Sequence, residues 1–511
     1  MSTSSSLGLR SERGPILIAL MLSTSLIALD STILATAVPS IVADLGGLSQ
    51  FPWLFSVYLL AQAVSVPVYA KLADTLGRKP VILVGIALFL LGSILCGFAW
   101  SMGSLIVMRA LQGLGAGAVL PMTTTIAADI YTVAERAKTQ GYIASVWAVS
   151  SVVGPTLGGV FSQFASWRWI FFVNIPFCLL AAWMLWRSYD ESVERRRHRI
   201  DYAGAALLTV ALTLLILAVL EGGQAWAWSS WQSIGSFGVG AVLLAVFGVV
   251  ERRAAEPVLP LEVLTRRLIV ATCLISIGIG TVLVGLTSYV PTFLERSTGA
   301  TPIVAGLAVA ALTIGWPISA SQSGRLYMRV GFRPTALIGL VVASVGAVSL
   351  WLTSSTPSVW ATAGSCLVVG LGLGLVATPT LIAAQASVPW NERAVVTGTN
   401  MFMRSVGSAV GVAIFGAIAN AVIASRGGDA SRDAVRAGSS AVFLAVVVAA
   451  LVSIAAGLLM PHTRAEDVEH DGPAGDTGDT GDSEPSGGRD DSGEPDLPDR
   501  VPQPSTRTST A

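Results

Sequence analysis

Charged residues are scarce in this sequence. They make up 12% of its 511 residues, whereas hydrophobic residues make up 53%, and the mean hydropathy is +0.70. A water-soluble globule of this length would not stay in solution with so little charge. We therefore expect an integral membrane protein.

Cysteine and histidine are also rare, and neither is placed for metal or redox chemistry. The four cysteines lie in apolar runs, where small buried hydrophobes are expected. The three histidines lie in polar segments, so the apolar runs offer no imidazole for a metal site or proton relay. A membrane-embedded enzyme would need acids, histidines or cysteines gathered at one depth, and the runs contain no such group. These residues are Cys96, Cys178, Cys273, Cys366, His198, His462 and His470.

The sequence lacks a Walker-type phosphate-binding loop, so ATP is not expected to drive the protein. We expect neither a cofactor nor a metal ion. The arginines follow the turns between apolar runs and do not gather in one patch, so no nucleic-acid partner is expected.

Long apolar runs are abundant. A helix needs about 20 apolar residues to cross the hydrocarbon, and we find fourteen such runs. An even number of spans puts both termini on one side of the membrane. The first run is too long for a removable signal peptide and lacks a cleavage-type ending. The runs begin near residues 15, 52, 80, 104, 138, 168, 201, 231, 268, 301, 334, 358, 396 and 438.

The basic residues indicate the orientation, because cytoplasmic turns carry an excess of lysine and arginine. With the N-terminus inside, most basic residues fall in cytoplasmic turns. We therefore expect a multi-pass protein with cytoplasmic N- and C-termini. We also expect it to be a monomer and to lie in the cell membrane. The outer turns hold only Arg168, Arg296, Arg426, Arg432 and Arg436.

Two stretches repeat at an offset of 254 residues: "AKLADTLGRKP" at 70–80 and "GRLYMRVGFRP" at 324–334. Repeated helical halves are common in secondary transporters, with the substrate site between them. The acidic tail lacks aromatic residues and is expected to be disordered. The predicted organisation is an N-terminal segment (1–13), a six-helix bundle (14–190), two additional helices with basic linkers (191–266), a second six-helix bundle (267–462) and the tail (463–511).

Asp30, in "IALDSTILATAVPS", is the one acid before the tail that lies well inside an apolar run. At 1.5 Å per residue it lies ~15 Å from Ser40, in the outer part of the membrane core. A charge there costs at least ~2.5 kcal/mol. Desolvation disfavours the charged form, which can link protonation to conformation or to a ligand. We favour that role over a structural acid satisfied by Thr32 or a neighbouring helix.

Arg109, in "IVMRALQGLGAGAVLP", is the expected partner of Asp30, since it lies ~10 Å below the outer surface. Forming or losing this pair would switch the charge state of the acid. Gly113, Gly115 and Gly117 follow the arginine and permit close helix contact.

Two further motifs are candidates for conformational roles. The short turn with Asp74, Gly77, Arg78 and Lys79 is basic, as membrane topology requires, but topology does not explain Asp74. We expect this acid to pair with a helix end or an arginine and to latch one conformation. In "SVVGPTLGGVF" at 151–161, a proline and glycines predict a kink with close helix contact, which plain packing would also explain.

Together these stretches resemble the major facilitator superfamily, specifically its fourteen-helix drug:proton antiporters. "LDSTILATAVP" resembles the first-helix motif, "AKLADTLGRKP" the motif of the loop between helices 2 and 3, "MRALQGLGAGAV" the helix-4 motif and "VVGPTLGG" the antiporter motif of helix 5. The resemblance spans residues 14 to about 460. Ala70 and Thr75 depart mildly from the loop motif.

This resemblance implies an all-α integral membrane protein with two six-helix bundles and two extra central transmembrane helices. It implies a transporter and not an enzyme. By the resemblance, Asp30 and Arg109 serve proton coupling, Asp74, Gly77, Arg78 and Lys79 serve gating, and Gly154, Pro155, Gly158 and Gly159 form the antiporter kink.

The function implied is export of lipophilic small molecules driven by a proton gradient, with the substrate, protons and the lipid bilayer as partners. The second half has no deep acid, which disfavours dicationic substrates and favours neutral, zwitterionic or monocationic lipophiles. A dedicated exporter of one endogenous product, such as a lipid, siderophore or self-made antibiotic, stays open as an alternative. A nutrient symporter is disfavoured by the "GPTLGG" motif.

Overall fold

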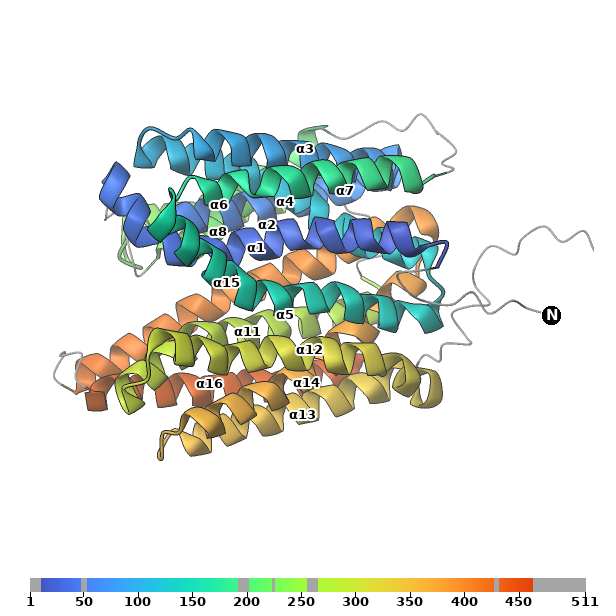
Figure 1. Ribbon diagram of the computed structural model, residues 1–511. Coiled ribbons are helices and arrows are strands. Elements are labelled where there is room, and N and C mark those ends of the chain that lie inside the picture. Colours follow the sequence, from blue (N-terminus) through green and yellow to red (C-terminus); the bar gives the residue numbers. More distant parts are fainter. Residues whose placement is uncertain are drawn as a thin grey trace, which may run out of the picture. The chain divides into compact units, whose positions relative to one another are not determined.

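The computed structural model describes residues 11–46, 53–191, 202–222, 226–254, 265–426 and 432–462, and the regular elements of this part are helices (Figure 1). The N-terminal residues 1–10 and the predicted tail at 463–511 lie outside the described residues. The expectation of an all-α fold is confirmed.

The helices fall into two halves with a pair between them. Within the first half, α6 and α7 form one span that is interrupted at Val173. The first half contains α1 (Gly14–Leu45), α2 (Trp53–Leu76), α3 (Arg78–Gly97), α4 (Met102–Ile130), α5 (Val133–Phe164), α6 (Trp169–Phe172) and α7 (Asn174–Ser188). The pair is α8 (Tyr202–Glu221) and α9 (Trp231–Glu251). The second half contains α11 (Arg267–Thr298), α12 (Pro302–Val330), α13 (Phe332–Thr353), α14 (Val359–Ala386), the short turn η1 (Trp390–Glu392), α15 (Arg393–Ser425) and α16 (Arg432–Leu459).

Among the described residues, 13 helical spans are long and apolar enough to cross a membrane, and a shorter apolar helix, Ala203–Val219, lies within α8. Together they account for the fourteen predicted runs. Some helices begin earlier than the runs because polar residues form their first turns. At the start of α5, for example, the Glu135 carboxylate accepts the backbone N–H of Thr132 at 3.1 Å.

Contacts between helix ends show which ends lie together on one side of the bundle. Arg13, before α1, pairs with Glu135 of α5 at 3.3 Å. Arg267 Nε, at the start of α11, donates to the Leu459 carbonyl at the end of α16 at 2.8 Å. We call this end of the bundle, which also holds the α2–α3 turn and the start of α15, the basic end.

At the opposite end, Asp44 of α1 pairs with Arg168 at 2.7 Å and accepts a hydrogen bond from Trp167 Nε1 at 3.0 Å. The Arg168 guanidinium and the indole N–H lower the pKa of the Asp44 carboxyl from its usual value. These contacts join the end of α1 to the start of the α6–α7 span.

The repeat seen in the sequence is present in the backbone. Gly77 and Gly331, 254 residues apart, have φ angles of 100° and 90°, and each precedes the helix that follows the turn. Side chains rarely adopt such angles, so both turns require glycine. The two halves therefore share the same turn.

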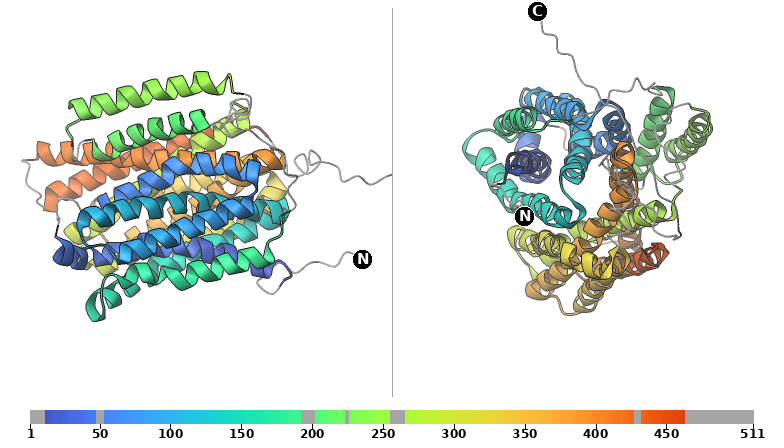
Figure 2. Two further views of the ribbon diagram at one scale, coloured as in Figure 1. Left: turned by 90° about the horizontal axis from the view of Figure 1, so that it is seen from above. Right: turned by 90° about the vertical axis from the view of Figure 1, so that its right-hand side faces the viewer.

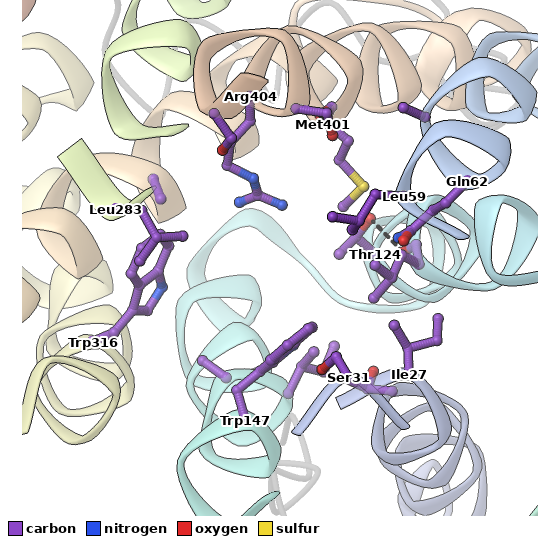
Figure 3. Close-up of a pocket in the computed structure, with 18 of the residues that line it drawn as sticks. Ile27, Ser31, Leu59, Gln62, Thr124, Trp147, Leu283, Trp316, Met401 and Arg404 are labelled. Atoms are coloured by element: carbon purple, nitrogen blue, oxygen red, sulfur yellow. Dashed lines mark hydrogen bonds between the residues drawn. The ribbon is translucent and has the colours of Figure 1, made fainter. Parts of the chain in front are cut away.

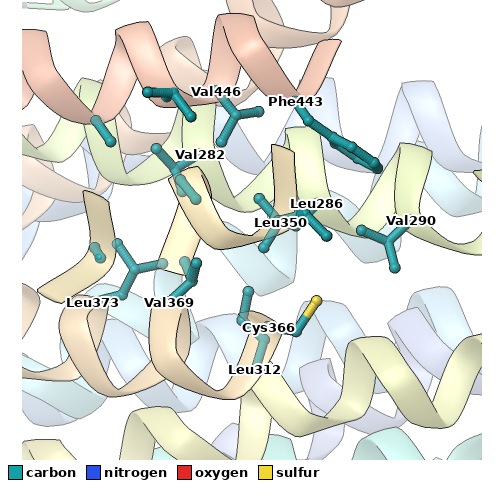
Figure 4. Close-up of a cluster of buried hydrophobic side chains, with 14 of the residues drawn as sticks. Val282, Leu286, Val290, Leu312, Leu350, Cys366, Val369, Leu373, Phe443 and Val446 are labelled. Atoms are coloured by element: carbon teal, nitrogen blue, oxygen red, sulfur yellow. The ribbon is translucent and has the colours of Figure 1, made fainter. Parts of the chain in front are cut away.

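Each half also holds a helix pair at backbone contact. A Cβ on Gly85 of α3 would lie 3.1 Å from the Gly115 carbonyl oxygen of α4, and a Cβ on Gly339 of α13 would lie 2.8 Å from the Gly372 oxygen of α14. Small residues permit such approach between membrane helices. Apolar side chains fill the remaining space of the second half, as Figure 4 shows for Val282, Leu286, Leu350, Val369, Leu373, Phe443 and Val446.

The additional pair lies beside both halves, at the edge drawn in green in the right-hand view of Figure 2. Helix α9 packs on α8, and α8 contacts both α2 and α15. The pair thus covers a line along which the first half meets the second. The buried apolar side chains that join these elements are Ala63, Val64, Val66, Leu208, Leu212, Ile216, Phe247 and Phe402.

We expect Gly115→Val to destabilise the protein. Its Cβ would collide with the Phe89 backbone nitrogen and lie 2.6 Å from the Gly85 oxygen, and overpacking typically costs about 1–3 kcal/mol. Gly103→Ala on the same helix is the matched control, because a Cβ there meets no atom within 4 Å. Thermal unfolding of the purified proteins should show a lower Tm for Gly115→Val alone. Equal Tm values would contradict the described α3–α4 contact.

Candidate functional site

Asp30 and Arg109 form an ion pair inside the first half. Arg109 Nη1 lies 2.6 Å from Asp30 Oδ2, and both residues are 1% exposed. Arg109 Nε also donates to the Leu54 carbonyl at 3.2 Å. The pair therefore joins α4 to α1 and α2.

Gln112 completes the hydrogen bonding of this pair. Its Nε2 donates to Asp30 Oδ1 and to Ser93 Oγ, both at 2.8 Å, and its Oε1 accepts from Arg109 Nη1 at 2.7 Å. Asn174 of α7 donates to the same Ser93 oxygen at 3.3 Å. Both carboxylate oxygens thus have donors, as a buried charge requires. We call Asp30, Arg109, Gln112, Ser93 and Asn174 the buried network.

Tyr58 of α2 separates the buried network from a cavity. Its ring centroid lies 4.2 Å from Arg109 Cζ, and the residue is 2% exposed. Its hydroxyl has no hydrogen-bond partner among the described residues. Because the same side chain also lines the cavity, a displacement of the Arg109 guanidinium would change the cavity wall.

The cavity has a volume of about 530 Å³ and lies between the two halves. Its walls come from α1, α2, α4 and α5 on one side, from α11, α12, α14 and α15 on the other, and from Ile216 of α8. This volume suits a drug-sized small molecule. Figure 3 shows Ser31, Gln62, Thr124, Trp147, Trp316, Met401 and Arg404 around the space.

A second charged cluster joins the halves at the basic end. The Asp74 carboxylate of α2 accepts the backbone N–H groups of Ala394 and Val395 at 3.2 and 2.9 Å. Arg78 Nη2 donates to the same carboxylate at 2.8 Å. A negative charge is favourable at the N-terminus of a helix. The first half thereby holds the start of α15 in the second half.

Arg78 extends this cluster to two more elements. Its Nε lies 3.1 Å from Asp129 Oδ2 of α4, and its Cζ lies 3.4 Å from the Trp390 ring centroid. Asp129 also pairs with Arg393 at 3.2 Å. We call Asp74, Arg78, Asp129, Trp390 and Arg393 the basic-end latch.

The other two residues of the predicted gating turn lie differently. The Gly77 backbone makes the turn, after which the N–H groups of Arg78 and Lys79 donate to the Glu191 carboxylate at 2.8 Å each. The Lys79 ammonium lies 3.4 Å from Asp190, whose side chain is 98% exposed, and pairs with no other described acid. The Lys79 side chain is therefore not part of the basic-end latch.

The repeat of this turn in the second half also contacts the opposite half. The Tyr327 hydroxyl of α12 donates to the Val133 carbonyl at the start of α5. The Tyr327 ring stacks on Phe332 with centroids 4.8 Å apart, and Phe332 occupies the repeat position of Arg78. With both turns engaged, the basic end is closed in this conformation.

Gly154, from the predicted kink, packs against α1 close to the buried network. A Cβ at this position would collide with Thr32 Oγ1. Thr32, two residues after Asp30, donates to the Ser150 carbonyl at 3.0 Å. The glycine therefore allows α5 to lie against the part of α1 that carries Asp30.

The other predicted kink residues have different surroundings. Gly158 is buried, whereas a Cβ on Gly159 would meet no atom within 4 Å. The side chain of Pro155 lies outside what the structure describes. Among the four predicted kink residues, the structure describes a contact with α1 for Gly154.

Sequence reasoning missed several residues of these clusters. Gln112 could have been found, because its i, i+3 spacing from Arg109 puts both on one helix face. Asp129 carried a weaker signal, as an acid at a helix end. Tyr58, Trp390 and Arg393 carried none, because their partners come from distant parts of the chain.

Comparison with known proteins identifies the family. The model of the Major Facilitator Superfamily matches residues 20–412. The chain belongs to the major facilitator superfamily. This membership places it among multi-pass membrane transporters and not among enzymes.

Individual members of the superfamily are similar over most of their length. Multidrug resistance protein 3 of Bacillus subtilis is 35% identical over 416 residues, covering 81% of each chain. Multidrug transporter protein MdtP of the same bacterium is 34% identical over 414 residues, covering 81% of this chain and 76% of its own. A human organic anion transporter of known structure has a TM-score of 0.62 at 15% identity, covering 88% of this chain and 99% of its own, which shows likeness of fold.

We expect Asp74→Asn to open the basic end. Loss of the charge weakens the hold on the start of α15 and on Arg78. The reporter is Ala70→Cys, which is 1% exposed and lies 2.7 Å from a Cβ built on Gly398 of the opposite half. In a background whose four native cysteines are alanine, maleimide should label Ala70→Cys several-fold faster when Asp74→Asn is present. Lys79→Gln is the matched control and should leave the rate unchanged. Equal labelling with and without Asp74→Asn would show that the carboxylate does not hold the basic end closed.

Proposed function

We propose that the protein is a proton-coupled efflux transporter that exports lipophilic small molecules by alternating access. The observation that carries this proposal is the buried Asp30–Arg109 pair beside the cavity, with Tyr58 between them. Ionisable groups inside the membrane are costly and are typical of proton pathways. Similarity to two bacterial multidrug transporters supports export as the direction. An exporter dedicated to one endogenous product stays the alternative.

In this proposal the basic end faces the cytoplasm, following the distribution of arginine and lysine. The described conformation is then closed to the cytoplasm by the basic-end latch and by Tyr327. It corresponds to the state that releases substrate outside. Opening the basic-end latch would give the state that takes substrate from the cytoplasm or the inner leaflet.

Protonation of Asp30 provides the switch. The neutral acid no longer balances Arg109, which keeps the Gln112 oxygen, the Leu54 carbonyl and the Tyr58 ring as partners. The guanidinium then relaxes toward these groups, and the Tyr58 ring moves with it. Since Tyr58 is part of the cavity wall, the proton and the substrate influence each other through this side chain.

The energy of one proton is sufficient for useful export. A membrane potential of 100 mV contributes ~2.3 kcal/mol per elementary charge. Each 1.4 kcal/mol corresponds to about a tenfold concentration ratio. One proton per cycle therefore supports a ratio of about 40-fold for a neutral substrate.

We expect Asp30→Asn to abolish pH-driven transport. The amide keeps the shape of the carboxylate but cannot carry the proton. In proteoliposomes with an imposed pH difference, the wild type should move a lipophilic dye against its gradient, and Asp30→Asn should bind the dye without accumulating it. Asp44→Asn, on the same helix but outside the buried network, is the control and should transport like the wild type. Undiminished pumping by Asp30→Asn would mean that the acid is structural and that coupling lies elsewhere.

We expect the Tyr58 ring, and not its hydroxyl, to be required for coupling. Tyr58→Phe keeps the face that contacts Arg109, and the hydroxyl has no described partner to lose. Tyr58→Leu keeps apolar volume but removes the cation–π contact, which is worth ~2 kcal/mol when desolvated. Initial rates of pH-driven transport should be unchanged for Tyr58→Phe and lower by about tenfold or more for Tyr58→Leu. Equal rates for the two variants would exclude coupling through the ring.

A further inference from the structure

The cavity contains one charge that neither the buried network nor the basic-end latch uses. Among the described residues that line it, Arg404 of α15 is the only side chain that is ionised at neutral pH. No described residue forms a hydrogen bond or an ion pair with its guanidinium. Figure 3 shows the side chain extending from α15 into the cavity.

Backbone packing fixes the position of Arg404. A Cβ on Gly280 of α11 would collide with the Arg404 carbonyl oxygen, and a Cβ on Gly407 would collide with the Ile277 oxygen. The two glycines therefore allow α15 to lie against α11 at Arg404 itself and three residues after it. With the backbone fixed on that side, the long side chain extends toward the opposite half.

The surroundings of the guanidinium are aromatic and neutral. Trp147 of α5 and Trp316 of α12 point into the same space in Figure 3. The other polar groups of the cavity wall are amides and hydroxyls, such as those of Gln62 and Thr124. Such walls accept a lipophilic body, while the arginine provides a single cationic anchor.

A lipophilic cation finds no matching carboxylate among the described residues that line this cavity. The acid adjacent in sequence to a lining residue is Asp30, which precedes Ser31. Its two oxygens are already bonded to Arg109 and Gln112, and it is 1% exposed. A cation would therefore meet the positive Arg404 without compensation. Sequence reasoning, which considered acids alone, did not weigh anionic substrates.

We propose that Arg404 is the substrate anchor of the cavity and that the transporter binds lipophilic monoanions, such as aromatic carboxylates. An unmatched guanidinium inside the membrane is costly and is stabilised by a carboxylate, which it can bind through two parallel hydrogen bonds. The proposal rests on the proposed function only for the direction of transport.

Anionic cargo has an electrical consequence. One proton entering while one monoanion leaves moves two positive charges inward. One proton entering while one monocation leaves moves no net charge. An inside-negative potential therefore drives export of the anion even without a pH difference, and has no effect on export of the cation.

The test compares three probes that share one ring system: 1-pyrenebutyrate, neutral 1-pyrenebutanol and 4-(1-pyrenyl)butyltrimethylammonium. Binding to purified full-length protein in detergent is followed by energy transfer from tryptophan to pyrene, without any gradient. The wild type should bind the carboxylate more tightly than the ammonium probe. Arg404→Gln should weaken carboxylate binding about 10- to 100-fold and leave binding of the alcohol within about twofold.

Two further variants serve as controls. Arg404→Lys keeps the charge without the planar fork and should retain more of the carboxylate affinity than Arg404→Gln. Ser425→Ala removes a hydroxyl at the end of the same helix, outside the cavity, that donates to the Val422 carbonyl, and it should leave binding of all three probes unchanged.

Equal losses for the carboxylate and the alcohol in Arg404→Gln, or tighter binding of the ammonium probe by the wild type, would overturn the assignment. Because binding needs no gradient, these outcomes are separate from those of Asp30→Asn. If the protein binds the carboxylate through Arg404 but shows no pH-driven transport, the proposed proton coupling is wrong and the role of Arg404 as anchor stands. If the protein transports the ammonium probe in a pH-driven manner and Arg404→Gln does not change this transport, the role of Arg404 is wrong and the proton coupling stands.

Discussion

A charge inside an apolar bundle must be matched by an opposite charge or by hydrogen bonds, and the arrangement of this protein depends on that requirement. The Asp30 carboxylate accepts hydrogen bonds from Arg109 and Gln112. Gln112 also donates to Ser93, which accepts a further hydrogen bond from Asn174. The buried network therefore connects α1, α2, α3, α4 and α7. Because so many helices share one carboxylate, a change in its charge is felt across the first half and not at one contact.

The same requirement shapes the closed basic end, but there the partners belong to different halves. The Asp74 carboxylate faces the start of α15, and Asp129 lies between Arg78 and Arg393. At the repeated turn, an uncharged tyrosine makes the corresponding contact with α5. The closed state is thus held by charge at one of the two repeated turns and by an aromatic hydroxyl at the other. Opening requires both turns to separate from the opposite half.

Much of this could be predicted from the sequence, because membrane-spanning helices have a strong local signal. Apolar length predicted the spans, and the turn repeat predicted two related halves, which Gly77 and Gly331 show in the backbone. The pairing of Asp30 with Arg109 could be inferred because few other charges lie at that depth. Tyr58, Trp390 and Arg393 could not be identified, since their importance comes from the helices against which they pack. Arg404 is a charge in an apolar run, but whether it is matched depends on tertiary packing.

The unmatched Arg404 places a constraint on how the proposed coupling can work. A bound anion attracts the proton on Asp30, and a protonated Asp30 leaves Arg109 to attract the anion, so direct electrostatics favours binding both together. Two unit charges ~10 Å apart in a medium with an effective dielectric constant of ~20 attract each other by about 1–2 kcal/mol, which gives the scale of such an effect inside a protein. Exchange requires the opposite linkage, in which proton and cargo exclude each other. In the proposed mechanism the contact between Arg109 and Tyr58 supplies this linkage, because a guanidinium released from Asp30 would move the ring that forms part of the cavity wall. In the proposed antiport, exclusion through the cavity wall must exceed that attraction. The shape of Tyr58 would then determine the exchange more than the electric field of Asp30.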